Sequence, residues 1–180
     1  MTTLHDFNDG NGPVPAHQHC NGRGWVADTA LVADTCYVGP YAAVFGNASM
    51  YDNASMHDNA RIYGNARMFD NACMYGSASM GDNARMSGNA SMDGNARMCG
   101  NAAATRPPLT LQVGAYPVTI SDRHITIGCT TDTLHGWRTS QDLTKDPQTA
   151  AYMHAIAVIA EQHQGATVHA LDIDLPYSPT

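Results

Sequence analysis

The sequence predicts a mainly β protein built around a parallel β-helix, and three regularities predict it. Alanine recurs at every sixth position from residue 42 to residue 102. A Met, Ile or Val stands two residues after each alanine from 44 to 98. A Gly or Asp, followed by Asn at all positions but Ser77, precedes each alanine from 48 to 102. Self-similarity at a fixed short period is typical of a repeat architecture rather than of an ordinary globular core.

The period of six fits strands and does not fit a helix. In a helix, six residues advance about 600°, so successive repeats would point to different sides. In a strand, Ala at position i and Met at i+2 lie on one face, and the residue between them points outward. The Gly/Asp-Asn pair then turns the chain, because Gly and Asn tolerate the positive φ of a tight corner. We therefore expect alanine and methionine to fill the interior of a solenoid.

Three hexads close one triangular coil, so residues 18 apart stack at about 4.8 Å, the spacing of paired strands. Weaker hexads at 25–26, 30–32 and 36–38 keep the same register before the regular ones begin. The β-helix is therefore predicted over residues 24–104, which is about 4.5 coils.

The two ends of the chain lack this period. Residues 1–23 are rich in Gly, Asn, His and Pro and predict a loop that caps the first coil, whose strand edges would otherwise be unpaired. Pro107 and Pro108 mark a boundary, after which 105–180 predicts a small α+β domain. Its expected elements are strands at 109–113, 118–121, 124–127 and 166–173, a helix at 147–163, and a loose tail at 176–180.

Composition excludes several classes of protein. The formal net charge of -7 argues against a nucleic-acid binder, which needs a basic surface. No run of about 18 apolar residues predicts a membrane span, and residues 1–12 lack the pattern of a secretory signal. The five cysteines are widely spaced without a CxxC, so we expect reduced thiols and a cytoplasmic location.

The outward positions are the ones left for function, since the inward ones pack the core. At 18-residue spacing, one face stacks Arg67 and Arg85 beside Tyr51 and Phe69. Guanidinium groups next to aromatic rings recognise a phosphate attached to a base. These four residues, with Arg61 and Arg97 on another face, are the candidate ligand-binding residues. The alternative interpretation is a solvated face, or a subunit interface with Asp partners such as Asp70.

Hexads such as NARIYG (59–64) and NARMSG (83–88) resemble the hexapeptide-repeat, left-handed parallel β-helix family, which includes acyltransferases and γ-class carbonic anhydrases. The resemblance implies a left-handed coil and a homotrimer. Residues 22–39, the repeats, and 116–129 with Trp137 are similar to a group of phage and prophage hexapeptide-repeat proteins without a settled activity. That likeness implies a viral protein acting in a bacterial host cell.

Catalytic and metal candidates are few. His57 is the one histidine within the regular repeats, so it is the candidate general base if the chain is an acyltransferase. A carbonic anhydrase-like zinc site needs more histidines than this region has. His17, His19 and Cys20 form an HQHC segment that is the candidate metal site, although a flexible polar loop is the interpretation we prefer. The methionine column fits the core rather than copper, and no cofactor is predicted.

The sequence thus favours a non-enzymatic phage or prophage binding protein. Its expected partner is a host protein or a small anionic, nucleotide-like ligand held between solenoid subunits, and counter-defence is a role that the resemblance suggests. An acyl-coenzyme A-dependent acyltransferase and a structural virion component are the two alternatives.

Overall fold

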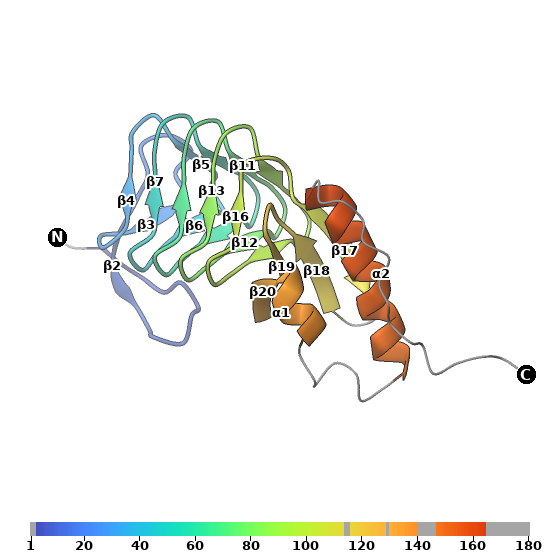
Figure 1. The fold of residues 1–180 in the computed structure, drawn as a ribbon. Coiled ribbons are helices and arrows are strands. Elements are labelled where there is room, and N and C mark those ends of the chain that lie inside the picture. The colour runs from blue at the N-terminus through green and yellow to red at the C-terminus, as the bar shows by residue number, and fades with distance from the viewer. Residues whose placement is uncertain (1–2, 114–115, 129, 140–146, 165–180) are drawn as a thin grey trace, which may run out of the picture.

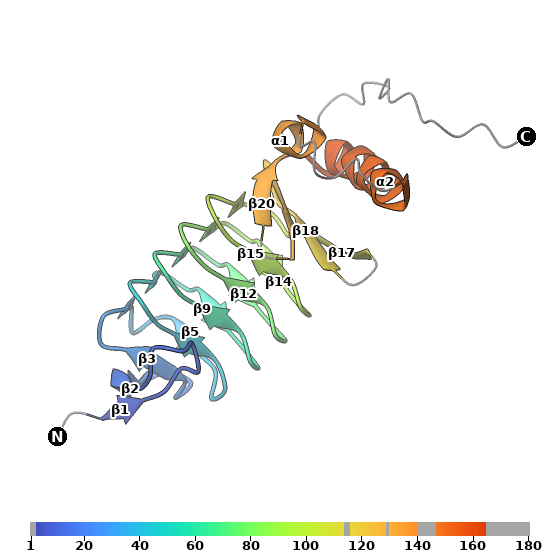
Figure 2. The same ribbon diagram turned by 90° about the horizontal axis from the view of Figure 1, so that it is seen from below.

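Three-sided coils stack along one axis in the computed structural model, which describes residues 3–113, 116–128, 130–139 and 147–164 (Figures 1 and 2). One face consists of β3 Trp25–Ala27, β6 Ala43–Val44, β9 Arg61–Ile62, β12 Ser79–Met80 and β15 Arg97–Met98. A second consists of β4 Leu31–Val32, β7 Ser49–Met50, β10 Arg67–Met68, β13 Arg85–Met86 and β16 Ala103–Ala104. The third consists of β5 Tyr37–Val38, β8 Ser55–Met56, β11 Cys73–Met74 and β14 Ser91–Met92.

Neighbouring strands within each face are parallel and 18 residues apart, as the period predicts. Arg67 pairs with Ser49 on one side and with Arg85 on the other. The alanines and the large apolar residues of the repeats from 48 to 98 are at most 1% exposed and form one continuous core. The parallel β-helix is therefore confirmed, and its interior is the predicted column of alanine and methionine.

The corners have a division of roles that the sequence did not predict. It is the Gly or Asp of each hexad, from Gly46 to Gly100, that has positive φ, while the following Asn does not. Each corner Asp also accepts a backbone N–H from the next coil: Asp70 Oδ2 lies 2.9 Å from Gly88 N, and Asp82 Oδ2 lies 2.9 Å from Gly100 N. These bonds satisfy amides that the short strands leave unpaired.

The asparagines stack above one another instead. Asn47, Asn65 and Asn83 are joined in series by side-chain amide contacts of 3.5 and 3.4 Å, and another series runs through Asn53, Asn71 and Asn89. The corner polar residues are thus committed to the architecture. Asp70, which we considered as an ion-pair partner for the arginines, is one of these corner acceptors.

The predicted N-terminal cap is present, but it contains strands as well as a loop. Strand β1 Leu4–His5 pairs antiparallel with β2 Val14–Gln18, and β2 pairs antiparallel with β3 of the first coil. This pairing covers the exposed edge of β3, which is the physical reason for a strand here. Residues 6–13 between β1 and β2, called the strap below, lie against the face that contains β6 and β9.

A small α+β unit follows the last coil and lies at the opposite end of the solenoid from β1 and β2 (Figure 2). It consists of the antiparallel strands β17 Leu109–Val113, β18 Tyr116–Ile120, β19 His124–Ile127 and β20 Thr130–Thr133, with helices α1 Leu134–Thr139 and α2 Pro147–Gln164. The helix and three strands match prediction, whereas β20 and α1 were not predicted. The predicted strand at 166–173 and the tail at 176–180 lie outside the described residues. No helix in the described ranges has the length and apolar character needed to cross a membrane.

This unit has a core separate from that of the solenoid. Val118, Ile120 and Ile125 of the sheet pack against Ile156 and Ala160 of α2. Ile156 and Ala160 are four residues apart, so they lie on one side of α2 and reach the sheet together.

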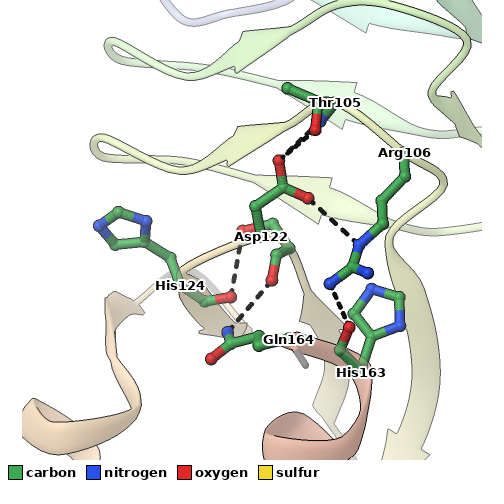
Figure 3. Close-up of polar contacts among 7 residues, drawn as sticks. Thr105, Arg106, Asp122, His124, His163 and Gln164 are labelled. Carbon is green, nitrogen blue, oxygen red and sulfur yellow. Dashed lines mark hydrogen bonds and ion pairs between the residues drawn. The ribbon is translucent and has the colours of Figure 1, made fainter. Parts of the chain in front are cut away.

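A polar cluster joins the unit to the solenoid (Figure 3). Asp122 Oδ2 accepts hydrogen bonds from the backbone N and the hydroxyl of Thr105, both at 2.8 Å. Its other oxygen lies 3.6 Å from Nε of Arg106, whose guanidinium also donates to the carbonyl of His163 at the end of α2. Asp122 therefore links the last corner of the solenoid, the β18–β19 turn and the helix.

Two histidines of the junction are partly buried. Burial lowers the pKa of His124, and burial together with the Arg106 charge lowers the pKa of His163. Nδ1 of His124 and Nε2 of His163 are buried, and no described residue offers either a hydrogen bond. Both rings are therefore held in a setting that favours their neutral form.

Candidate ligand-binding groove

The candidate binding surface lies where the strap meets the face of β6, β9, β12 and β15. A cavity of about 240 Å³ is lined there by Asn8 and Asp9 of the strap and by Phe45, Arg61, Tyr63, Ser79 and Arg97 of the solenoid. A second cavity of about 230 Å³ shares Asn8 and Arg61 with it. Arg61 and Arg97 are the predicted residues that line this groove.

Arg61 is held in place by the strap. Its guanidinium carbon lies 5.0 Å from the centre of the Phe45 ring, and Nη2 donates to the carbonyl of Phe7. A guanidinium has five N–H donors, so these contacts leave others available toward the cavity. The position of the charge is thus fixed before any ligand binds.

Stacked aromatic rings form the wall of the groove. Phe7 stacks on Phe45 with ring centres 4.9 Å apart, and Phe45 stacks on Tyr63 with centres 5.5 Å apart. Burial, then the neighbouring Cys99, raises the pKa of Tyr63, so its phenol stays protonated at neutral pH. The wall therefore offers an apolar ring surface together with a neutral hydroxyl.

Gly81 makes room for the Tyr63 ring. A Cβ at Gly81 would lie 2.4 Å from Cε2 of Tyr63 and 2.5 Å from its Cζ. The equivalent outward position holds Phe or Tyr in five of the six hexads from 45 to 75, and His57 in the sixth, so Gly81 interrupts that series. The interruption was a signal that the sequence offered and that we did not use.

The 240 Å³ cavity is lined by two guanidiniums and one carboxylate, and the second cavity adds the carboxylate of Asp6. The backbone N and side-chain amide of Asn11 donate to Asp9, and these bonds, with a smaller effect of Arg61, lower the pKa of Asp9. Asp9 is therefore ionised at neutral pH. Arg97 is exposed to solvent. Its backbone N donates a hydrogen bond to Thr119 Oγ1 of β18 at 3.0 Å. The 240 Å³ cavity therefore has a positive balance, and Asp9 is its carboxylate acceptor for a ligand N–H or O–H.

The Arg67 and Arg85 face is different in character. The two arginines are neighbours in register and both are exposed, as predicted, and Tyr51 is 38% exposed. No ion pair involves either guanidinium among the residues that the structure describes. None of the cavities given above is lined by this face, so Arg67 and Arg85 lie on an open surface.

Searches against protein-family models, curated proteins and solved structures found no match to this chain. The site is therefore interpreted from its own geometry.

The remaining candidates lie elsewhere. His57 is on the third face, and its ring stands between those of Tyr37 and Tyr75 at centre distances of 4.9 and 4.7 Å. Within the described residues no hydrogen bond or ion pair reaches the His57 ring. Of the HQHC segment, Nδ1 of His17 lies 2.9 Å from Asp28, whereas His19 and Cys20 lie near Asp34. The segment comprises the end of β2 and the turn that follows it.

Phe7, Asp9 and Phe45 are parts of the groove that the sequence reasoning missed. Phe45 and Tyr63 are 18 residues apart at the same outward position, so their stacking could have been inferred from the period. Phe7 and Asp9 lie outside any repeat, and nothing in their local sequence indicates which face the strap covers.

Proposed function

We propose that this chain is a non-enzymatic binding protein that holds a small anionic ligand with a planar ring, such as a nucleotide, in the groove between the strap and the solenoid. The observation that carries the proposal is the convergence of Arg61, Arg97 and the Phe45–Tyr63 wall on one cavity. Guanidiniums bind phosphate through paired N–H donors, and aromatic faces stack on bases. The site lies within one chain, so it does not need the subunit contact that the sequence suggested.

The size and polarity of the groove define the ligand class. A cavity of about 240 Å³ is below the 300–1,000 Å³ usual for drug-sized ligands. It suits one phosphate and part of a base or sugar, and the adjoining cavity extends the space beyond Arg61. Asp9 would accept a hydrogen bond from a sugar hydroxyl or a base amine, which favours a nucleotide over a simple inorganic anion.

Isothermal titration of the full chain with nucleoside mono- and diphosphates, cyclic nucleotides and inorganic phosphate tests the proposal. A hydrogen bond to a charged group contributes about 1.5–3 kcal/mol, so Arg97→Ala should weaken nucleotide binding about 10- to 100-fold. Arg85→Ala is the matched control, since it removes the same exposed side chain from a face without the groove. It should leave the affinity unchanged.

Two results would refute this assignment. One is the absence of heat with every nucleotide of the panel. The other is a loss of affinity in Arg85→Ala that equals the loss in Arg97→Ala, which would move the site to the open face. Gly81→Ala provides a geometric check, because the added methyl group displaces the Tyr63 ring and should weaken binding while Arg61 and Arg97 remain.

The other expectations stay predictions. Viral origin, counter-defence, a host-protein partner, a homotrimer and cytoplasmic location rest on the resemblance and on composition. We do not propose acyl transfer, because the stacked position of His57 gives it no orienting carboxylate among the described residues. A role as a virion component is tested by mass spectrometry of purified particles.

A further inference from the structure

Three metal-ligating side chains of different types meet at the N-terminal end of the solenoid, away from the groove. His19 and Cys20 lie in the turn between β2 and β3, and Asp34 lies in the turn between β4 and β5. One donor atom from each residue lies within 4.8 Å of the other two. The set combines nitrogen, sulfur and oxygen, which together are ligands that Zn²⁺ accepts.

His19 is the buried member of the set and has unused hydrogen-bonding capacity. His19 is only 4% exposed, and its Nδ1 lies 3.1 Å from the carbonyl oxygen and 3.3 Å from the backbone N of Asn21. Nε2 is buried, and no described residue is its hydrogen-bond partner. In the tautomer that carries its proton on Nδ1, toward the Asn21 carbonyl, Nε2 keeps a lone pair, which is the usual arrangement of a metal-bound imidazole.

Cys20 and Asp34 supply the charged ligands. Cys20 Sγ lies 3.7 Å from Asp34 Oδ1, where the thiol now donates weakly to the carboxylate. In a tetrahedral zinc site with bonds of about 2.3 Å to sulfur and 2.0 Å to oxygen, these atoms would be about 3.5 Å apart. Loss of the thiol proton would leave two adjacent negative charges, and a divalent cation between them offsets their repulsion.

The backbone around the three residues is already ordered. His19 N donates to Gly24 O at 2.9 Å, and Asn21 is bonded to the 36–38 hexad through Val38 N at 3.0 Å and Cys36 O at 3.0 Å. Ala33 N, next to Asp34, donates to Met50 O at 3.0 Å. A metal would therefore bind to a preformed site without folding a loop.

We propose that His19, Cys20 and Asp34 bind one Zn²⁺, which fastens the cap to the first coil. Two ligands come from the turn that leads out of the cap, and the third comes from a solenoid corner, so the ion would tie the two together. Asp34 takes the place that the sequence had suggested for His17, which lies beside Asp28 instead. Three protein ligands leave a fourth position for water.

Titration of the full, reduced chain with Co²⁺ tests the proposal, because Co²⁺ reports its ligands in the absorption spectrum. We expect one Co²⁺ per chain, a thiolate-to-metal charge-transfer band, and displacement of the Co²⁺ by Zn²⁺. Cys20→Ser should abolish the band. Asp34→Asn should weaken binding at least 10-fold, consistent with the loss of a direct ligand.

Two controls separate this site from other histidines and thiols. His17→Ala removes the other histidine of the HQHC segment, and Cys73→Ser removes a partly exposed thiol on the third face. Neither should change the stoichiometry or the band. Since the Cys20 and Asp34 side chains are exposed, their variants should fold normally, which circular dichroism checks. The proposal is overturned if the folded parent chain gives no band, or if the band persists in folded Cys20→Ser.

Discussion

Replacing Met68 by alanine tests the architecture most directly. Met68 lies in the middle of the stack, paired with Met50 on one side and Met86 on the other, and its residue is 0% exposed. Its neighbour Arg67 belongs to the same two-residue strand but points outward and is exposed. Two adjacent substitutions therefore compare the inside and the outside of one strand.

The size of the effect follows from what is removed. Met68→Ala deletes three buried heavy atoms, for which transfer alone contributes about 0.8 kcal/mol each, and the cavity that remains adds to this loss. The neighbouring alanines and methionines are fixed by their own strand pairing, so the cavity cannot close fully. We expect a loss of about 3 kcal/mol, within the 2–5 kcal/mol typical of Met→Ala in a core. In a chain of this length that lowers Tm by about 6–12 °C.

Urea unfolding followed by circular dichroism measures this difference. Arg67→Ala should change the free energy of unfolding by less than about 0.5 kcal/mol, and Met68→Leu, which conserves volume, by less than about 1.5 kcal/mol. The m-value should be the same in all variants, since the surface exposed on unfolding is unchanged. If Arg67→Ala destabilised as much as Met68→Ala, or if Met68→Ala lost under 1 kcal/mol, the inward column would not be the core.

Two further predictions concern a corner and the junction. Gly64 and Gly94 both have positive φ, but a Cβ at Gly64 would lie 2.8 Å from the backbone N of Asp82, whereas one at Gly94 would meet nothing within 4 Å. Thermal unfolding should therefore show a loss of about 1–2 kcal/mol for Gly94→Ala from φ alone, and a larger loss for Gly64→Ala; equal losses would contradict the close coil contact. At the junction, burial lowers the pKa of His124 from 6.5, so the unfolded chain binds more protons just below that pH. Its contribution to stability is complete above about pH 6.5 and is lost as pH falls toward the folded pKa, so unfolding measured from pH 7.5 to 5 should show a decline that His124→Gln reduces; an unchanged slope in the variant would assign the decline to other groups.

Much of the solenoid could be predicted because its information is periodic. A hexad places Ala48 and Met50 inward whatever else the chain does, since side chains alternate along a strand and the corner recurs every sixth residue. The register of Arg67 against Ser49 and Arg85 follows from the same period. The corner was predicted less well, because tolerance of positive φ is shared by Gly, Asn and Asp, and only the backbone shows which residue adopts it.

The positions of the groove and of the proposed zinc site were harder to predict from the sequence than the solenoid. Arg61 and Arg97 were recognised as outward, yet the repeat pattern alone does not distinguish them from Arg67 and Arg85 on the other face. The groove exists because Phe7 stacks on Phe45 and its carbonyl accepts from Arg61, contacts that join residues 38 and 54 positions apart in a segment without a repeat. The zinc site likewise needed Asp34, a corner residue of a weak hexad, to lie beside Cys20.

The sequence by itself determined the β-helix, its core and the outward direction of each arginine, because these depend on alternation and a fixed period. The tertiary structure alone decided which arginines line a groove, that His19 and Cys20 meet Asp34, and that Asp122 joins the last coil to the C-terminal unit. Those contacts come from the two non-repeating ends folding back on the solenoid. No local pattern encodes where such a segment lands, since its position depends on side-chain packing and on backbone groups of distant coils.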